Sequence, residues 1–168
     1  MFNKNTILGG VTLVMLSTSA MAGDTPIVGN VQSKCSIYTD RQGVYGNPLP
    51  NKLSTGVADG GILPIIRYDV AQGDYYLAKI AWPNAFSSSP SLSDVITWDG
   101  DVTVSEVSDT LMSAYSTTKV EYNNIVEFDL TVSGSTWFSV DSSAAYGYDK
   151  SFPAGSYTAV VTAECIAK

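Results

Sequence analysis

The chain has 168 residues, 45% of them hydrophobic, and its 9 Lys and Arg against 16 Asp and Glu give a formal net charge of −7. This acid excess argues against a nucleic-acid partner and against anionic lipid surfaces, because both require clustered basic residues. The absence of histidine excludes Ser-His-Asp and Cys-His catalysis and the usual His-containing zinc sites. No phosphate-binding glycine loop is present either. The sequence therefore predicts a protein that is not an enzyme and needs no cofactor.

Residues 1–22 have the three parts of a secretory signal peptide. Lys4 supplies positive charge, residues 7–16 form an apolar run, and residues 20–22 form an A-x-A cleavage site. The alternative is a membrane anchor, but a run of this length is too short for a bilayer, which requires about 20 residues. We therefore expect export, cleavage after Ala22 and a secreted single domain over residues 23–168 with no membrane span. Loss of Lys4 leaves eight basic against sixteen acidic residues, a net charge of −8.

The first half of this domain reads as short strands. Residues 27–38 alternate between polar and apolar side chains, with Val31, Cys35 and Ile37 on one face. Two apolar runs follow at residues 62–69 and 75–82, and Pro64 places the first of them at a strand start or on a sheet edge. Residues 85–93 read as a surface loop.

The second half continues the pattern. Residues 94–98 and 102–107 are predicted to be two strands joined by a turn at Asp99-Gly100. Residues 109–115 favour a turn or two of helix. Further strands are expected at residues 120–122, 125–132, 136–140 and 156–166. Eight or nine short strands separated by turn residues predict an all-β fold, a single Ig-like β-sandwich.

The two cysteines are expected to form a disulfide between the first and last strands. Cysteines in an exported protein usually pair, and the alternatives are free thiols or a bridge between subunits. Cys165 shares its strand face with Tyr157, Ala159, Val161 and Ala163, as Cys35 does with Val31 and Ile37. If both faces point into the core, the bridge joins the strands from inside the sandwich.

Two further groups of side chains are candidates for binding. Asp99 and Asp101 could offer oxygens to calcium, joined by Asp141 or Asp149, but a solvated turn is the favoured interpretation. A glycosidase carboxylate pair is a further alternative, although no motif marks one. Tryptophans could stack sugars, and three are present: Trp82, Trp98 and Trp137. We expect Trp82 and Trp137 to pack in the core, and Tyr146 and Tyr148 to be exposed.

Residues 29–35 (GNVQSKC) resemble the opening of a major fimbrial subunit, where Gly-x-Val-x-x-x-Cys begins the first strand of an incomplete Ig-like sandwich. The ending PAGSYTAVVTAEC is similar to the Gly-x-Tyr final strand of exported pilin-like domains. The chain differs in two respects. Chaperone–usher pilins pair the first cysteine with one in the following strand, whereas here the expected partner of Cys35 is near the C-terminus. Only residues 23–30 precede the first strand, which is short for a donor extension. The resemblance implies a pilin-like sandwich in a fibre, pilus or biofilm matrix.

Assembly is expected to occur through β-strand pairing with copies of the same chain or with related surface subunits. A short segment precedes Cys35 outside the disulfide loop and could pair with a sheet edge of the next subunit; it consists of Asp24, Thr25, Pro26, Ile27 and Val28. The alternative function is a secreted carbohydrate-binding module with a glycan ligand.

Overall fold

The computed structural model describes residues 34–168, so the predicted signal peptide and the segment 24–28 lie outside the described residues. Most of the described chain is β-strand: β1 (Cys35–Arg41), β2 (Gly46–Leu49), β3 (Lys52–Ser54), β4 (Ile65–Val70), β5 (Tyr76–Ala81), β6 (Phe86–Ser88), β7 (Ile96–Val107), β8 (Val120–Tyr122), β9 (Ile125–Leu130), β10 (Gly134–Tyr146), β11 (Thr158–Ala159) and β12 (Thr162–Ala167). Two 3-10 turns, η1 (Val57–Asp59) and η2 (Thr110–Ala114), and the helical turn α1 (Tyr115–Thr118) complete it.

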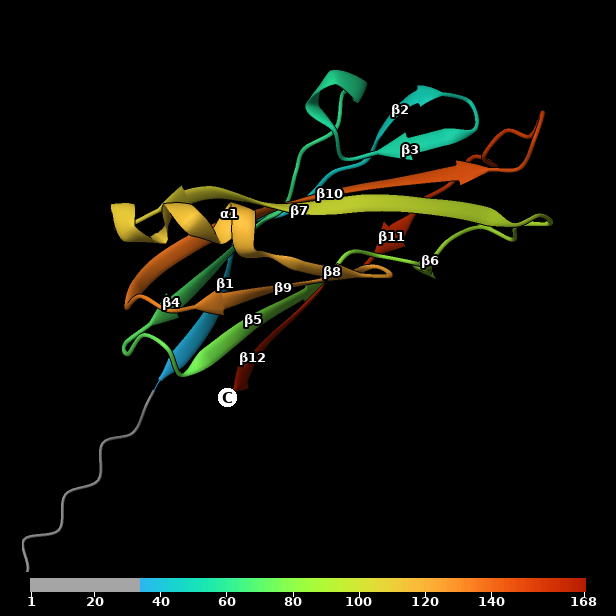
Figure 1. Ribbon diagram of the computed structural model, residues 1–168. Helices are drawn as coiled ribbons and strands as arrows, with labels where there is room; N and C mark the ends of the chain where they lie inside the picture. The colour runs from blue at the N-terminus through green and yellow to red at the C-terminus, as the bar shows by residue number, and fades with distance from the viewer. Residues whose placement is uncertain (1–33) are drawn as a thin grey trace, which may run out of the picture. The chain divides into compact units, whose positions relative to one another are not determined.

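The larger sheet is built around β10, which is 13 residues long. One edge of β10 pairs with β7 along almost its whole length. The other edge pairs first with β4, up to Ser139 opposite Ile65, and then with β3 from Ser143 onward. β1 pairs outside β4, and β2 pairs outside β3. The sheet therefore divides along β10 into a β4–β1 branch and a β3–β2 branch (Figure 1).

The smaller sheet, in the order β12-β5-β9-β8, packs against the β4–β1 branch (Figure 1). Alternate residues of β4 and β9 are buried, as the period-2 sequence pattern predicts. Aromatic rings join the two layers: Phe138 lies with its centroid 4.5 Å from Phe128 and 5.5 Å from Tyr68. Met112 and Tyr115, on the predicted helical segment, complete this core. The all-β sandwich prediction is confirmed.

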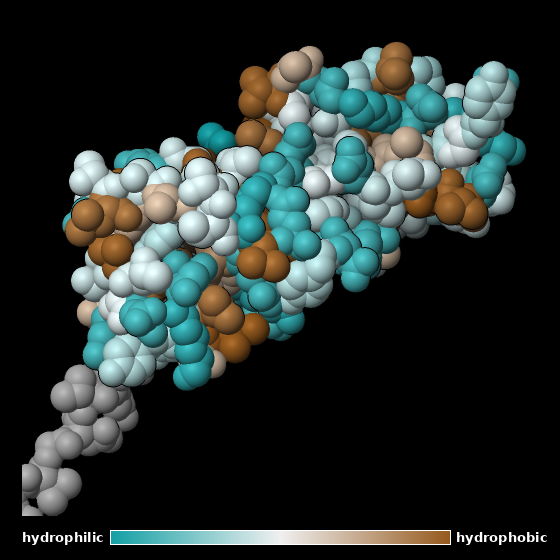
Figure 2. Space-filling model, viewed as in Figure 1, coloured by the Kyte–Doolittle hydropathy of each residue, from teal (hydrophilic) through white to brown (hydrophobic). Residues whose placement is uncertain are grey.

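An aromatic cluster forms a second centre of packing beside the far half of β7 and β10. Phe86 on β6 lies at its middle, with ring centroids 4.7 Å from Trp98 and 5.2 Å from Tyr157. Tyr45 and Phe152 also contact Phe86, and Phe152 stacks on Tyr146 at 5.3 Å. Hydrophobic residues are packed together in these two interior clusters but are scattered on the surface. On the face shown in Figure 2, they form several separate patches among hydrophilic ones.

The predicted turn at Asp99-Gly100 is wrong, because residues 96–107 form one continuous strand. Gly100 lies within the β7–β10 ladder, opposite Ser142. A Cβ atom at this position would lie 2.6 Å from two ring atoms of Trp82 and 2.7 Å from the Asp141 carbonyl oxygen. The glycine therefore allows the indole ring to approach the strand backbone, and it does not reverse the chain.

The number and length of the strands also differ from expectation. β1 continues to Arg41 and β10 to Tyr146, while the final predicted strand divides into β11 and β12 around Val160 and Val161. β2, β3 and β6 were not predicted, and β6 lies in the segment that reads as a loop. These strands are only three or four residues long, too short for a periodic pattern to identify them. Residues 34–168 therefore form twelve strands, where eight or nine were expected for the whole domain.

Candidate functional site: the groove between the sheet edges

The disulfide Cys35–Cys165 joins the first and last strands, and their Cα atoms lie 6.4 Å apart. Both cysteines are half-buried and pack against the core together with Ile37, Val161 and Ala163. The predicted pairing, and the prediction that it lies on the inner side of both strands, are confirmed. Disulfides of this kind are typical of oxidising compartments.

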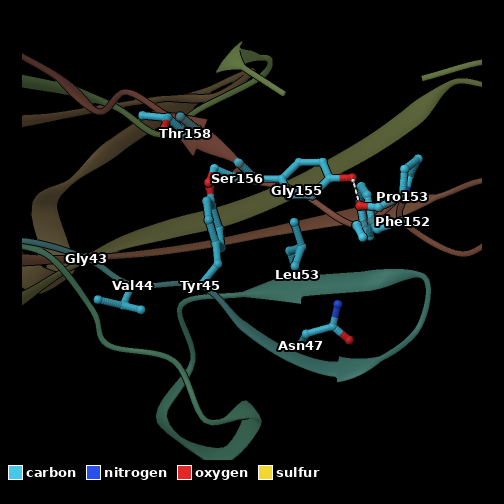
Figure 3. A pocket seen from close by; sticks show the side chains of 13 residues that line it. Gly43, Val44, Tyr45, Asn47, Leu53, Phe152, Pro153, Gly155, Ser156 and Thr158 are labelled. Atoms are coloured by element: carbon cyan, nitrogen blue, oxygen red, sulfur yellow. Dashed lines mark hydrogen bonds between the residues drawn. The ribbon is translucent and has the colours of Figure 1, made fainter. Parts of the chain in front are cut away.

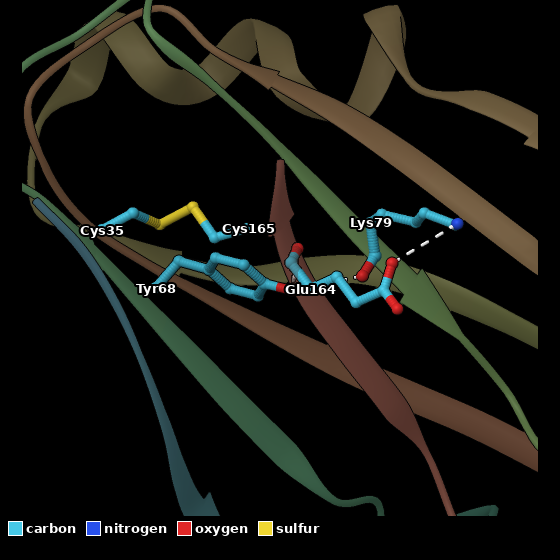
Figure 4. Close-up of a disulfide and its surroundings, with 5 residues drawn as sticks. All are labelled: Cys35, Tyr68, Lys79, Glu164 and Cys165. Carbon is cyan, nitrogen blue, oxygen red and sulfur yellow. Dashed lines mark hydrogen bonds and ion pairs between the residues drawn. A yellow bond between two sulfur atoms is a disulfide. The ribbon is translucent and has the colours of Figure 1, made fainter. Parts of the chain in front are cut away.

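Tyr68 connects the same two sheets beside the disulfide (Figure 4). Its ring is fully buried on β4, and its hydroxyl lies 3.1 Å from the Glu164 carbonyl oxygen and 3.3 Å from that of Lys79. Burial raises the pKa of this phenol well above its usual range, so the side chain stays neutral and remains a donor. The Lys79–Glu164 ion pair, at 3.4 Å, spans β5 and β12 on the outer side. The two sheets are thus firmly connected at this end.

Beyond the disulfide, Thr39 of β1 and residues 158–161, which precede β12, line an open hollow. Within residues 34–168, β1 pairs with β4 alone and β12 pairs with β5 alone, so their facing edges have no ladder partner. Thr39 and Val161, each four residues from its cysteine, lie on opposite sides of a hollow of about 400 Å³. A second hollow of about 610 Å³ continues it and shares the residues Gly43, Tyr45, Thr158 and Ala159. We call the combined space the edge groove.

The lining of the edge groove is uncharged, although the protein is acidic. Ile66 and Leu53, both 6% exposed, contribute buried aliphatic surface. The remaining lining residues are also uncharged: Thr39, Gln42, Gly43, Val44, Tyr45, Asn47, Thr55, Pro64, Pro83, Ser142 and residues 152–161. The groove thus presents apolar side chains, hydroxyls and backbone groups, and no charged side chain.

Tyr45 and Tyr157 hold the wider part of the groove in shape. Tyr45 extends from the segment before β2 towards Ser156 (Figure 3), and its hydroxyl lies 3.0 Å from the Ser142 hydroxyl. Burial raises the pKa of Tyr45, with the Ser142 hydrogen bond acting in the opposite direction. The Tyr157 hydroxyl donates to the Pro153 carbonyl oxygen at 2.6 Å and closes the loop around Gly155. No sequence pattern marks this groove apart from the turn-like Pro153-Ala154-Gly155.

Two of the carboxylates considered for calcium, Asp101 and Asp141, are engaged with other side chains. Asp101 Oδ1 accepts from Lys119 Nζ at 2.7 Å, and Asp141 Oδ1 accepts from the Thr55 hydroxyl at 3.1 Å. The β7–β10 register places Asp101 opposite Asp141 and Asp99 opposite Ser143. Across residues 34–168, no three or more His, Cys, Asp or Glu side chains are grouped so that they could hold a metal ion.

The structure places the predicted aromatic residues in different environments. Trp82 packs against the core as expected, and Tyr148 is 90% exposed as expected. Two predictions are wrong. Trp137 lies on the face of β10 opposite Phe138, outside the core, because the strand alternates from Phe138 inward to Trp137 outward. Tyr146 is buried at 3% exposure because β10 extends to it and Phe152 stacks on its ring.

Comparison with protein families, curated proteins and solved structures finds no match to this chain. In the described part of the chain, no helix has the length and apolar character needed to cross a membrane.

Proposed function

We propose that the chain is a non-enzymatic structural subunit of an extracellular fibre, a pilus or a cell-surface matrix, which assembles with copies of itself or with related subunits through β-strand pairing. The observation that carries this proposal is the edge groove, which has an uncharged lining and lies between Thr39 of β1 and the residues that precede β12. Within residues 34–168, β1 and β12 each have one edge without a ladder partner. An extended segment lying there would pair with backbone groups that these edges otherwise leave to water. The fimbrial resemblance of residues 29–35 and the signal-peptide pattern of residues 1–22 favour the same function.

The donor in this proposal is the segment 24–28 of the next subunit. It precedes Cys35, so it can leave its own domain without opening the disulfide loop. Ile27 and Val28 provide apolar side chains for the aliphatic lining, and residues 25–28 are uncharged like the groove. A donor on one subunit and an acceptor on another form a head-to-tail contact, which propagates into a filament when it does not close into a ring.

The disulfide determines where the donor segment can lie. A third strand inserted between two others needs them separated by twice the strand spacing, about 9.6 Å. The Cα atoms of Cys35 and Cys165 are only 6.4 Å apart, so this end of the groove is closed. The donor segment therefore occupies the part beyond Thr39 and Val161.

Deletion of residues 24–28 tests the donor half of this scheme. The truncated protein is expected to remain a folded, oxidised monomer, whereas the full-length exported protein forms filaments in electron micrographs. Filaments formed by the truncated protein would refute strand donation. A full-length protein that never forms them would refute the structural-subunit function.

A charged substitution tests the acceptor half. Val160 lines the groove and is 59% exposed, so Val160→Lys places a charge there with little risk to folding. Val95→Lys, at a valine that is 77% exposed and outside the groove, is the matched control. Val160→Lys is expected to block filaments and Val95→Lys to permit them. A mixture of Val160→Lys with the truncated protein should yield capped dimers by light scattering, because each supplies the half that the other lacks.

A further inference from the structure

On the outer face of the larger sheet, Arg67 of β4 lies between two aromatic residues, Tyr38 of β1 and Trp137 of β10. We call these three residues the aromatic row. The strand register places Tyr38 opposite Arg67 and Arg67 opposite Trp137. The Arg67 guanidinium carbon lies 4.7 Å from the centroid of the Tyr38 ring and 5.9 Å from that of Trp137, within the range of cation–π contacts. Tyr38 is 45% exposed and Trp137 is half-buried. Two large rings thus face solvent on a sheet whose inner face already supplies the core.

Carboxylates hold this row in a fixed geometry. Trp137 Nε1 donates to Asp40 Oδ2 at 2.7 Å, and an Arg67 terminal nitrogen lies 3.4 Å from the same oxygen. Arg67 Nε lies 3.1 Å from Asp69 Oδ1 on the other side. Because both the indole and the guanidinium are tethered, a ligand that stacks here meets side chains that are already ordered, which lowers the entropic cost of binding.

A hollow of about 280 Å³ lies next to the aromatic row. The register aligns Ser36, Asp69 and Ser135 across the same three strands. Each of them lies two residues from the row along its strand, and therefore on the same face of the sheet. These three residues line the hollow together with Tyr38, and Lys34 stands among the remaining lining residues. The surface therefore combines aromatic faces with two hydroxyls and a carboxylate, a set of groups that can both stack and exchange hydrogen bonds.

We propose that this face binds a neutral oligosaccharide. The C–H faces of sugar rings pack on aromatic rings, and sugar hydroxyls can donate to Asp69 and exchange hydrogen bonds with Ser36 and Ser135 in the hollow. Tyr38 and Trp137 are two strands apart, a span of about 10 Å that exceeds a single sugar ring. The two cations Lys34 and Arg67 are matched by Asp40 and Asp69, and Glu106 lies opposite Trp137 in the β7–β10 ladder, so the face offers no excess of positive charge to an anionic ligand.

This site is separate from the edge groove and does not depend on strand-mediated assembly. The aromatic row and the hollow lie on the outer face of β1, β4 and β10, whereas the groove lies beyond Thr39 of β1 and Val161, which precedes β12. The two sites have no lining residue in common. Sugar binding and self-assembly can therefore be measured and lost independently.

The test measures retention of the wild-type protein on a panel of immobilised neutral oligosaccharides of glucose, galactose, mannose and N-acetylglucosamine. At least one is expected to bind, and Trp137→Ala should weaken that binding about ten-fold through loss of stacking. Trp137→Phe should recover part of the affinity. Tyr38→Ala should weaken binding, while Tyr148→Ala, at an exposed tyrosine away from the face, serves as the matched control and should not.

The proposal is overturned if the wild-type protein is retained on none of the sugars, or if Trp137→Ala and Tyr148→Ala bind sugar equally well. It is also overturned if the wild-type protein binds no sugar and Trp137→Ala loses self-assembly. The last result would make the aromatic row a protein contact. Thermal melting of each variant identifies any that fails to fold. If Trp137→Ala fails to fold, the affinity of Trp137→Phe, which keeps a smaller aromatic ring, still tests the proposal.

Discussion

Removal of the Cys35–Cys165 disulfide should cost a large share of the stability of this domain. The two cysteines are separated by 130 positions, so the bridge closes nearly the whole described chain into one loop. In the chain-entropy model, a closed loop of this length restricts the unfolded state by about 5 kcal/mol at 25 °C. Domains of ordinary stability unfold with about 5–15 kcal/mol, so the loss is comparable to the lower end of that range.

Urea unfolding of Cys35→Ser, Cys165→Ser and the double variant measures this effect. Either substitution opens the same loop, so all three proteins should lose similar free energy of unfolding. The dependence of that free energy on urea should steepen, because the open unfolded chain exposes more surface. Tyr68 still connects the sheets beside the lost bridge, so the native circular dichroism should persist. A loss below about 2 kcal/mol in the double variant, under the usual range for a disulfide, would refute the entropic reasoning.

Two further predictions concern the core. Gly100→Ala should destabilise the protein by about 1–3 kcal/mol, because the new methyl group overlaps the Trp82 ring; Gly56→Ala, where the nearest atom is 3.1 Å away and φ is −57°, should cost less in thermal melting. Tyr68→Phe should lower stability at neutral pH by about 1 kcal/mol through loss of its hydrogen bond. Because burial raises the pKa of Tyr68 above its unfolded value of about 10, the contribution of the neutral phenol is complete below pH 10 and is lost as pH rises further. Above pH 10, the free energy of unfolding of Tyr68→Phe should therefore fall less steeply with pH than that of the wild-type protein. An equal fall in both proteins would contradict this assignment.

The sequence by itself determined the fold class and the pairing of the cysteines. In residues 125–130, apolar side chains recur at every second position, and a strand with one buried face requires that period. The same alternation placed Cys35 and Cys165 on inward faces, and two cysteines allow only one intrachain pairing. These are local properties of the chain, so they can be read without knowing which strand lies beside which.

The tertiary structure alone decided what depends on neighbours distant in sequence. Gly100 resembles a turn residue until Trp82 is seen against it, and Trp137 resembles a core residue until β10 is placed with Phe138 inward. The edge groove exists because the end of β1 and the segment that leads into β12 lie on either side of a hollow beyond the disulfide. The aromatic row exists because the register aligns residues from three strands. Register and sheet order arise from packing across the whole domain, which no short window of sequence contains.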